Sequence, residues 1–208
     1  MLFRSSYEYD AEYVWNYELY HRWTSADKRL RINSNLFYND YKDMQLPFTF
    51  GPNSIVIRNA DKVVTYGAEI NTEWQATEKL ALNAGIGMLK TDIKRYPNSS
   101  IEGNKLARAP SFSGKVGANY RLLDHLEIGT NYSYNSSYYS TADNLANGKV
   151  GHYDQLDVYL AYDFKHARIT LYADNVLNSR KDILLVPRSG DITRQPERQI
   201  GLSTELRF

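Results

Sequence analysis

The sequence predicts an all-β protein, an antiparallel up-and-down meander of about nine long strands that forms part of a transmembrane β-barrel. Apolar and polar residues alternate with a period of two in nine segments, as in a strand whose faces meet an apolar and a polar medium. The connections between these segments alternate between short and long. The 208 residues include 18 Tyr, which suits strands and the boundary between lipid and water.

The first four predicted strands form two hairpins. They are residues 16–23, 29–38, 64–75 and 80–88. In the third, Tyr66, Ile70 and Trp74 alternate with Glu69 and Glu73. Short turns join the strands of each pair, and a long connection carrying Pro47, Gly51 and Pro52 separates the pairs.

The remaining five predicted strands continue the pattern up to the chain end. They are residues 112–122, 126–135, 155–164, 169–173 and 197–208. Long polar loops are expected at about 91–110, 136–152 and 178–196. Such sidedness, with tight turns at one end and long loops at the other, is typical of outer-membrane barrels.

One aromatic residue ends the apolar face of every second strand, always on the short-turn side. These residues are Trp23, Trp74, Tyr120, Phe164 and Phe208. Aromatic side chains at one edge predict a girdle at the membrane interface, and strands of about nine to twelve residues suit a tilted crossing. A soluble sandwich or closed barrel would alternate too, but it would bury its apolar face.

Composition excludes several classes. The net charge of +1 gives no electrostatic reason to expect nucleic acid. Mean hydropathy is -0.56, and no apolar run approaches the roughly 18 residues of a membrane helix. The chain has no Cys, which removes disulfides and thiolate metal sites. Residues 1–9 do not read as a secretory signal, so an outer-membrane protein with this sequence is expected to be a mature portion or a fragment.

Catalytic and metal motifs are not found in the sequence. The four His residues are far apart and show no ligand spacing. There is no nucleophile elbow, and the glycines at 85 and 87 fall inside a predicted strand. Polar-face carboxylates such as Glu127, Asp157 and Glu205 favour a hydrated lumen wall over paired acid catalysis. We therefore expect no enzyme, no metal site and no cofactor.

Short motifs in a fixed order resemble the C-terminal half of a TonB-dependent outer-membrane receptor. They are Glu12 with WNYEL at 15–19, Asn59 followed by TYGAE at 65–69, LARAP at 106–110, NVLN at 175–178 and the terminal Phe208. The resemblance implies a barrel of about 22 strands around an N-terminal plug that engages TonB. Residues 1–208 are therefore expected to be the C-terminal portion of such a barrel, without the plug and the N-terminal strands.

Ligand contacts are expected from the long loops and the upper lumen. The candidates are Phe48, Phe50, Tyr96, Tyr138, Tyr139, Arg188 and Arg194. Aromatic rings and guanidinium groups could hold an anionic, aromatic iron chelate by stacking and charge. The alternative for each is a solvated loop whose side chains face lipopolysaccharide.

The resemblance implies a receptor for energised uptake of a scarce nutrient, most often a ferric siderophore, in the outer membrane of a Gram-negative bacterium. The implied partners are TonB through the missing plug, a small-molecule ligand, and outer-membrane lipid with lipopolysaccharide. Two alternatives stay open. One is a small outer-membrane barrel acting as an enzyme or adhesin, and the other is a soluble β-rich binding domain.

Overall fold

The computed structural model describes residues 9–51, 54–97 and 99–207, with the backbone alone at 48–51 and 54–55. Nine antiparallel strands form one sheet in the order β1-β2-β3-β4-β5-β6-β9-β10-β13. Their bounds are β1 Tyr13–Thr24, β2 Leu30–Gly51, β3 Ser54–Gln75, β4 Leu80–Arg95, β5 Phe112–Leu123, β6 Leu126–Asn135, β9 Tyr153–Asp163, β10 Ala167–Asp174 and β13 Gln199–Leu206. The predicted nine-stranded meander is confirmed.

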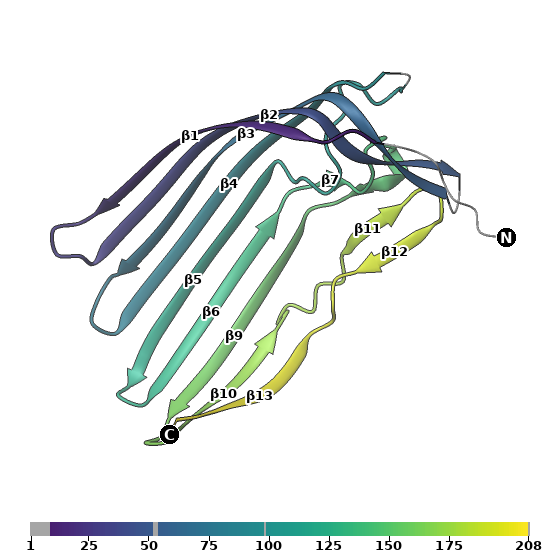
Figure 1. Cartoon of the computed structure of the whole chain (residues 1–208). Helices are drawn as coiled ribbons and strands as arrows, with labels where there is room; N and C mark the ends of the chain where they lie inside the picture. The colour runs from purple at the N-terminus through teal and green to yellow at the C-terminus, as the bar shows by residue number, and fades with distance from the viewer. Residues whose placement is uncertain (1–8, 52–53, 98, 208) are drawn as a thin grey trace.

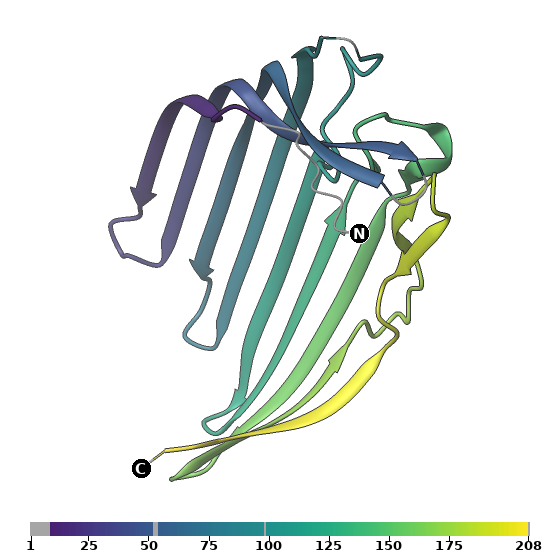
Figure 2. The same ribbon diagram turned by 45° about the vertical axis from the view of Figure 1, so that its right-hand side comes forward.

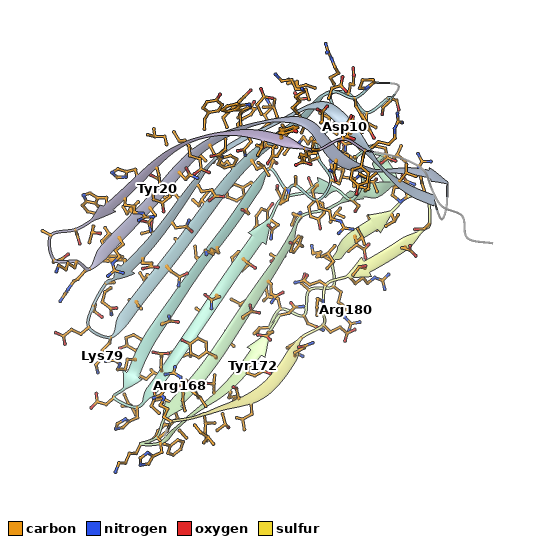
Figure 3. The ribbon with its side chains drawn as sticks, in the orientation of Figure 1. Asp10, Tyr20, Lys79, Arg168, Tyr172 and Arg180 are labelled. Atoms are coloured by element: carbon orange, nitrogen blue, oxygen red, sulfur yellow. The ribbon has the colours of Figure 1, made fainter. Side chains whose placement is uncertain are left out.

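The sheet is open and curved, with β1 and β13 at its two edges (Figures 1 and 2). Short turns gather at one end, marked by Lys79, and the long connections gather at the opposite end, near Asp10 (Figure 3). The structure contains no described helix that is long and apolar enough to span a membrane.

The pairing register brings the apolar positions of the alternating pattern in neighbouring strands together on one face. Leu171, for example, lies opposite Leu160 on one side and Leu202 on the other. This face is open: Ile200 and Leu202 are 70% and 66% exposed. The apolar face is thus not sealed beneath a second layer of described residues, as it would be in a soluble sandwich.

The predicted connection between the second and third strands is wrong, because β2 and β3 stay paired almost to its tip. The ladder runs from the pair Leu30–Trp74 to the pair Gly51–Ser54. Pro47 does not break it, since β1 stops pairing with β2 at Lys42. Beyond that point β2 is an edge strand, where the missing N–H of a proline leaves no ladder bond unmade.

The alternation of faces breaks at Asp43, whose φ is 56°. Below it Tyr41 pairs with Val63, and above it Leu46 pairs with Arg58. The pair that contains Val63 and the pair that contains Leu46 are an odd number of positions apart, so an unbroken ladder would place these two side chains on opposite faces. Both nevertheless belong to one buried cluster. The outer half of the β2–β3 hairpin therefore buries a different set of residues than its lower half does. In both views the outer part of the hairpin reaches across toward β7 (Tyr138–Tyr139), β11 (Asp182–Val186) and β12 (Asp191–Arg194) (Figures 1 and 2).

The main buried cluster lies where this hairpin meets the β4–β5 connection. It consists of Leu46, Ala60, Val63, Ile93, Tyr96 and Ile101. Asn59 ties the same region together, because its Nδ2 donates to the Asp43 carbonyl at 2.6 Å and to the Asp10 carbonyl at 2.9 Å. The Asp10 N–H donates back to Asn59 Oδ1 at 2.8 Å. The extended hairpin is thus a packed structure and not a free loop.

Two other predicted loops also contain strands. The 136–152 segment forms β7 (Tyr138–Tyr139), the 3-10 helix η1 (Ala146–Gly148) and β8 (Lys149–Val150). The 178–196 segment forms the hairpin of β11 (Asp182–Val186) and β12 (Asp191–Arg194). Their apolar runs are too short to separate from loop composition by period alone.

Candidate ligand-binding site

A cavity of about 560 Å³ lies at the long-connection end of the sheet. Four chain segments that are far apart in sequence line it: the outer part of β2, the β4–β5 connection, the segment after β7, and the turn of the β11–β12 hairpin. Its lining residues are Met44, Leu46, Pro47, Ile101, Leu106, Ala107, Arg108, Ser140, Thr141, Ala142, Asp143, Val186 and Arg188. The site is therefore a product of the tertiary fold.

Hydrogen bonds hold the β4–β5 connection against the segment after β7. Asn144 Nδ2 donates to the Lys105 carbonyl at 2.9 Å, and the Lys105 N–H donates to Asn144 Oδ1 at 2.8 Å. Asn104 Nδ2 donates to the Ala142 carbonyl at 3.0 Å. Next to the cavity, the Arg108 N–H donates to the Tyr139 carbonyl at 2.7 Å. Two walls of the cavity are thereby fixed to each other.

The β11–β12 hairpin is tied to the same structure. The Leu185 N–H donates to Ser140 Oγ at 2.9 Å, and Tyr138 OH donates to the Ile183 carbonyl at 2.6 Å. Gly148 lets the two segments approach, because a Cβ there would lie 2.6 Å from Cγ of Pro187. The third wall is therefore held by backbone and side-chain contacts together.

The cavity combines apolar walls with charge. Leu46, Ile101 and Val186 supply apolar surface, and Arg108 and Arg188 supply two guanidinium groups. Arg188 Nε lies 3.8 Å from Asp143 Oδ2. Two cations against one carboxylate leave the cavity positive, which suits a ligand with apolar surface and anionic groups.

The structure brings three of the seven predicted contact residues to this region. Arg188 lines the cavity directly, and Tyr138 and Tyr139 form the strand beside it. The Tyr138 ring stands edge-on to Tyr153 at 6.4 Å. Burial raises the pKa of Tyr138, so its hydroxyl stays a hydrogen-bond donor at neutral pH.

The other four predicted residues lie elsewhere or outside the described side chains. Tyr96 is 1% exposed within the buried cluster, and the Arg58 guanidinium lies 5.5 Å above its ring. Burial raises the pKa of Tyr96, and its ring packs in one cluster with Leu46 and Ile101, which line the cavity, without lining it itself. Arg194 lies on β12, with Nε 3.2 Å from Asp182 Oδ1. Phe48 and Phe50 lie on the backbone of β2, and their side chains are outside the described part.

Sequence reasoning missed Arg108 and the apolar wall. Arg108 stands within the LARAP motif at 106–110, and its φ of 55° turns the chain there. The motif carries part of the family resemblance, but nothing in its composition predicts that Arg108 lines the same cavity as Arg188. Leu46 and Pro47 fall within the long connection predicted between the second and third strands, and such a connection does not predict a structured wall.

Four of the five predicted girdle residues are exposed at the short-turn end. Trp23, Trp74, Tyr120 and Phe164 are each between 42% and 51% exposed, while Phe208 lies outside the described residues. A second aromatic row, not predicted, lies nearer the long connections. In it Tyr17 is opposite Tyr38, and Tyr38 is opposite Tyr66.

The polar face carries a charged network across four strands. Arg168 donates to Glu127 at 2.7 Å and to Asp163 at 2.9 Å. Tyr159 OH donates to Glu127 at 2.9 Å and lies 3.0 Å from Asn119 Oδ1. Every carboxylate in it has a cation or a hydroxyl partner, which is the arrangement of a polar wall more than of a catalytic acid pair. In the part of the chain that the structure describes, no group of three His, Cys, Asp or Glu could hold a metal ion.

Comparisons with known proteins agree with this architecture. The ferric yersiniabactin uptake receptor FyuA from Yersinia pestis is 22% identical and has a TM-score of 0.77 over 94% of this chain and 30% of its own. The closed form of the ferric-catecholate import receptor Fiu from E. coli K12 is 18% identical, with a TM-score of 0.75 over 94% of this chain and 27% of its own.

The sequence is also similar to that of a curated protein and matches a family model. It is 25% identical over 166 residues to the probable TonB-dependent receptor BfrD of Bordetella pertussis, covering 76% of this chain and 22% of that protein. The chain thus spans about a fifth of that relative and under a third of the two solved receptors. Residues 3–178 match the family described as TonB dependent receptor-like, beta-barrel. The chain belongs to the family of TonB-dependent receptor β-barrels.

Proposed function

We propose that residues 1–208 are the C-terminal portion of the barrel of a TonB-dependent receptor in the outer membrane of a Gram-negative bacterium. The family is one of transport receptors and not of enzymes. The exposed apolar face and the opposite polar face support this placement, because such a sheet suits lipid outside and water inside. β1 and β13 are the edge strands of the sheet, and their unpaired sides would pair with strands of the rest of the barrel.

The ligand we propose is a ferric siderophore. The observation that carries this proposal is the positively charged, apolar-walled cavity at the long-connection end. Its volume of about 560 Å³ lies within the usual range for small-molecule sites. Arg108 and Arg188 would contact the anionic groups of the chelate, and Leu46, Ile101 and Val186 would cover its apolar parts.

In the complete receptor the ligand would bind from outside, and TonB would act through the plug to open a path along the polar face. Within this chain, Asn104 and Asn144 hold the cavity walls together, so their role is to position Arg108 and not to touch the ligand. The hydrogen bonds between the connections keep the two guanidinium groups in place before the ligand binds. Less conformational entropy is then lost on binding.

The test replaces Arg108 and Arg188 with Gln in the complete receptor. Binding of a panel of ferric siderophores, measured by calorimetry, is expected to weaken about 100-fold or more in the double variant and about 10- to 100-fold in each single variant, because charged hydrogen bonds contribute roughly 1.5–3 kcal/mol each. Arg194→Gln is the matched control, since Arg194 pairs with Asp182 away from the cavity. Unchanged affinity in the double variant, or an equal loss in the control, would contradict the assignment.

A further inference from the structure

The described residues that line the cavity include one carboxylate, that of Asp143. Its Oδ1 accepts a hydrogen bond from Thr141 Oγ1 at 2.6 Å. The next residue, Asn144, has a φ of 50°, and its Nδ2 donates to the carbonyls of Lys105 and Thr141 at 2.9 and 3.2 Å. The side chain of Asp143 is only 23% exposed. The carboxylate is therefore held by a hydrogen-bonded turn at the cavity wall.

The other oxygen of Asp143 forms a loose ion pair with Arg188. Asp143 Oδ2 lies 3.8 Å from Arg188 Nε, which is beyond hydrogen-bond distance. On the polar face, by contrast, Arg168 lies 2.7 Å from Glu127 and 2.9 Å from Asp163. The Arg188 side chain is 44% exposed, and a pair of this kind contributes little to stability. Asp143 thus places a negative charge beside the guanidinium group without occupying its hydrogen-bond donors.

The cavity therefore has a definite pattern of charges and acceptors. Arg108 and Arg188 offer N–H donors to anionic oxygens. No described residue donates a hydrogen bond to Asp143 Oδ2, so this oxygen is open to a donor from a ligand. An anionic group that approaches Arg188 meets a like charge beside it, whereas an O–H, N–H or ammonium group meets an acceptor.

We propose that Asp143 is a specificity-determining residue of this cavity. It selects an anionic ligand that carries a hydroxyl, amide or ammonium donor beside its anionic group, and it disfavours a ligand whose surface is densely negative. Among ferric chelates it disfavours a compact trianion, such as a ferric tricatecholate without peripheral donor groups. The inference deepens the proposed function and rests on it, because it takes the cavity as the ligand site.

The test introduces Asp143→Asn into the complete receptor and uses two iron-free probes in ligand-detected NMR titrations. Benzenetricarboxylate carries negative charges alone, whereas aminomethylbenzoate carries one carboxylate and one ammonium group. Asparagine removes the charge but keeps an oxygen that can accept from Thr141. We expect the variant to bind the tricarboxylate at least about tenfold more tightly, and the aminomethylbenzoate at least about tenfold more weakly, than the unaltered protein does.

Asp182→Asn is the matched control. Asp182 also pairs with an arginine of the β11–β12 hairpin, since its Oδ1 lies 3.2 Å from Arg194 Nε, but it does not line the cavity. This control is expected to leave both affinities unchanged. In ligand-free detergent both variants should unfold at the temperature of the unaltered protein, because each removes a partly exposed ion pair. A change in binding is then not a change in folding.

Three outcomes would overturn the proposal: affinities for the two probes that stay the same or move in one direction in Asp143→Asn, an equal shift in Asp182→Asn, or no binding of either probe. The probes contain no iron, which separates this test from that of the transport ligand. If the probes shift as expected and no ferric siderophore binds, the proposed ligand is wrong and the role of Asp143 stands. If siderophores bind through Arg108 and Arg188 and the probes do not shift, only the role of Asp143 is wrong.

Discussion

Gly67→Ala is expected to prevent most of the chain from reaching its folded state. A Cβ at this position would lie 2.0 Å from the Met88 carbonyl oxygen and 2.7 Å from Cζ of Phe37. The Phe37 ring could turn aside, but the carbonyl belongs to the backbone of β4 and cannot move without breaking the β3–β4 ladder. We expect a loss of roughly 3 kcal/mol or more, at the upper end of overpacking effects.

The measurement is the folded fraction after refolding into detergent micelles, read from heat-dependent migration on gels and from urea unfolding. Gly151→Ala is the matched control, because a Cβ at Gly151 would meet no atom within 4 Å. The strand cannot escape by slipping one residue, since a slip would move its whole apolar set to the polar face. Equal stability of the two variants would show that β3 and β4 are farther apart than the structure places them.

Asn175→Ala is expected to release the long connection between β10 and β13. Asn175 is 2% exposed, with a φ of 49°. Its Nδ2 donates to the carbonyls of Ser179 and Pro196 at 2.8 Å each, and its Oδ1 accepts from the Ser179 N–H at 2.9 Å. Alanine would leave these backbone groups without their partner, at about 1–3 kcal/mol each, and it tolerates the left-handed conformation less well than asparagine.

Hydrogen exchange measures this effect locally. Protection of residues 179–196 is expected to fall by about a hundredfold or more, while the nine-stranded sheet keeps its protection. Asn147→Ala is the control, because Asn147 is an exposed residue of η1. Since Val186 of β11 and Arg188 in the β11–β12 turn line the cavity, the Asn175 variant should also weaken ligand binding. Unchanged exchange in 179–196 would show that the connection is held by other contacts.

The NVLN motif at 175–178, which carries part of the family resemblance, has a structural role. Asn175 and Asn178 both have positive φ values, of 49° and 52°, which asparagine adopts more readily than most residues. Asn178 Oδ1 accepts from the Arg198 N–H at 3.0 Å. The motif therefore joins the end of β10 to the start of β13, and no ligand contact is needed to explain it.

The alternation of residues by itself determined the nine strands, their order and their two faces. These features depend on a local period of two and on short turns, which set the register between neighbours. The second aromatic row could have been found in the same way. Tyr17 and Tyr38 lie at matching distances from the first short turn, so their pairing follows from the turn position.

The tertiary structure alone decided what the long connections do. Pro47 reads as a loop residue, yet it lies on a strand edge that exists only because β1 ends. Tyr96 reads as a loop aromatic, yet it is buried because the β2–β3 hairpin bends over it. Arg108 and Arg188 are 80 positions apart in the chain and line one cavity. A local sequence pattern predicts which medium each face of a strand meets. Contacts between segments that are distant in sequence depend on the path of the whole chain, and no local pattern predicts that path.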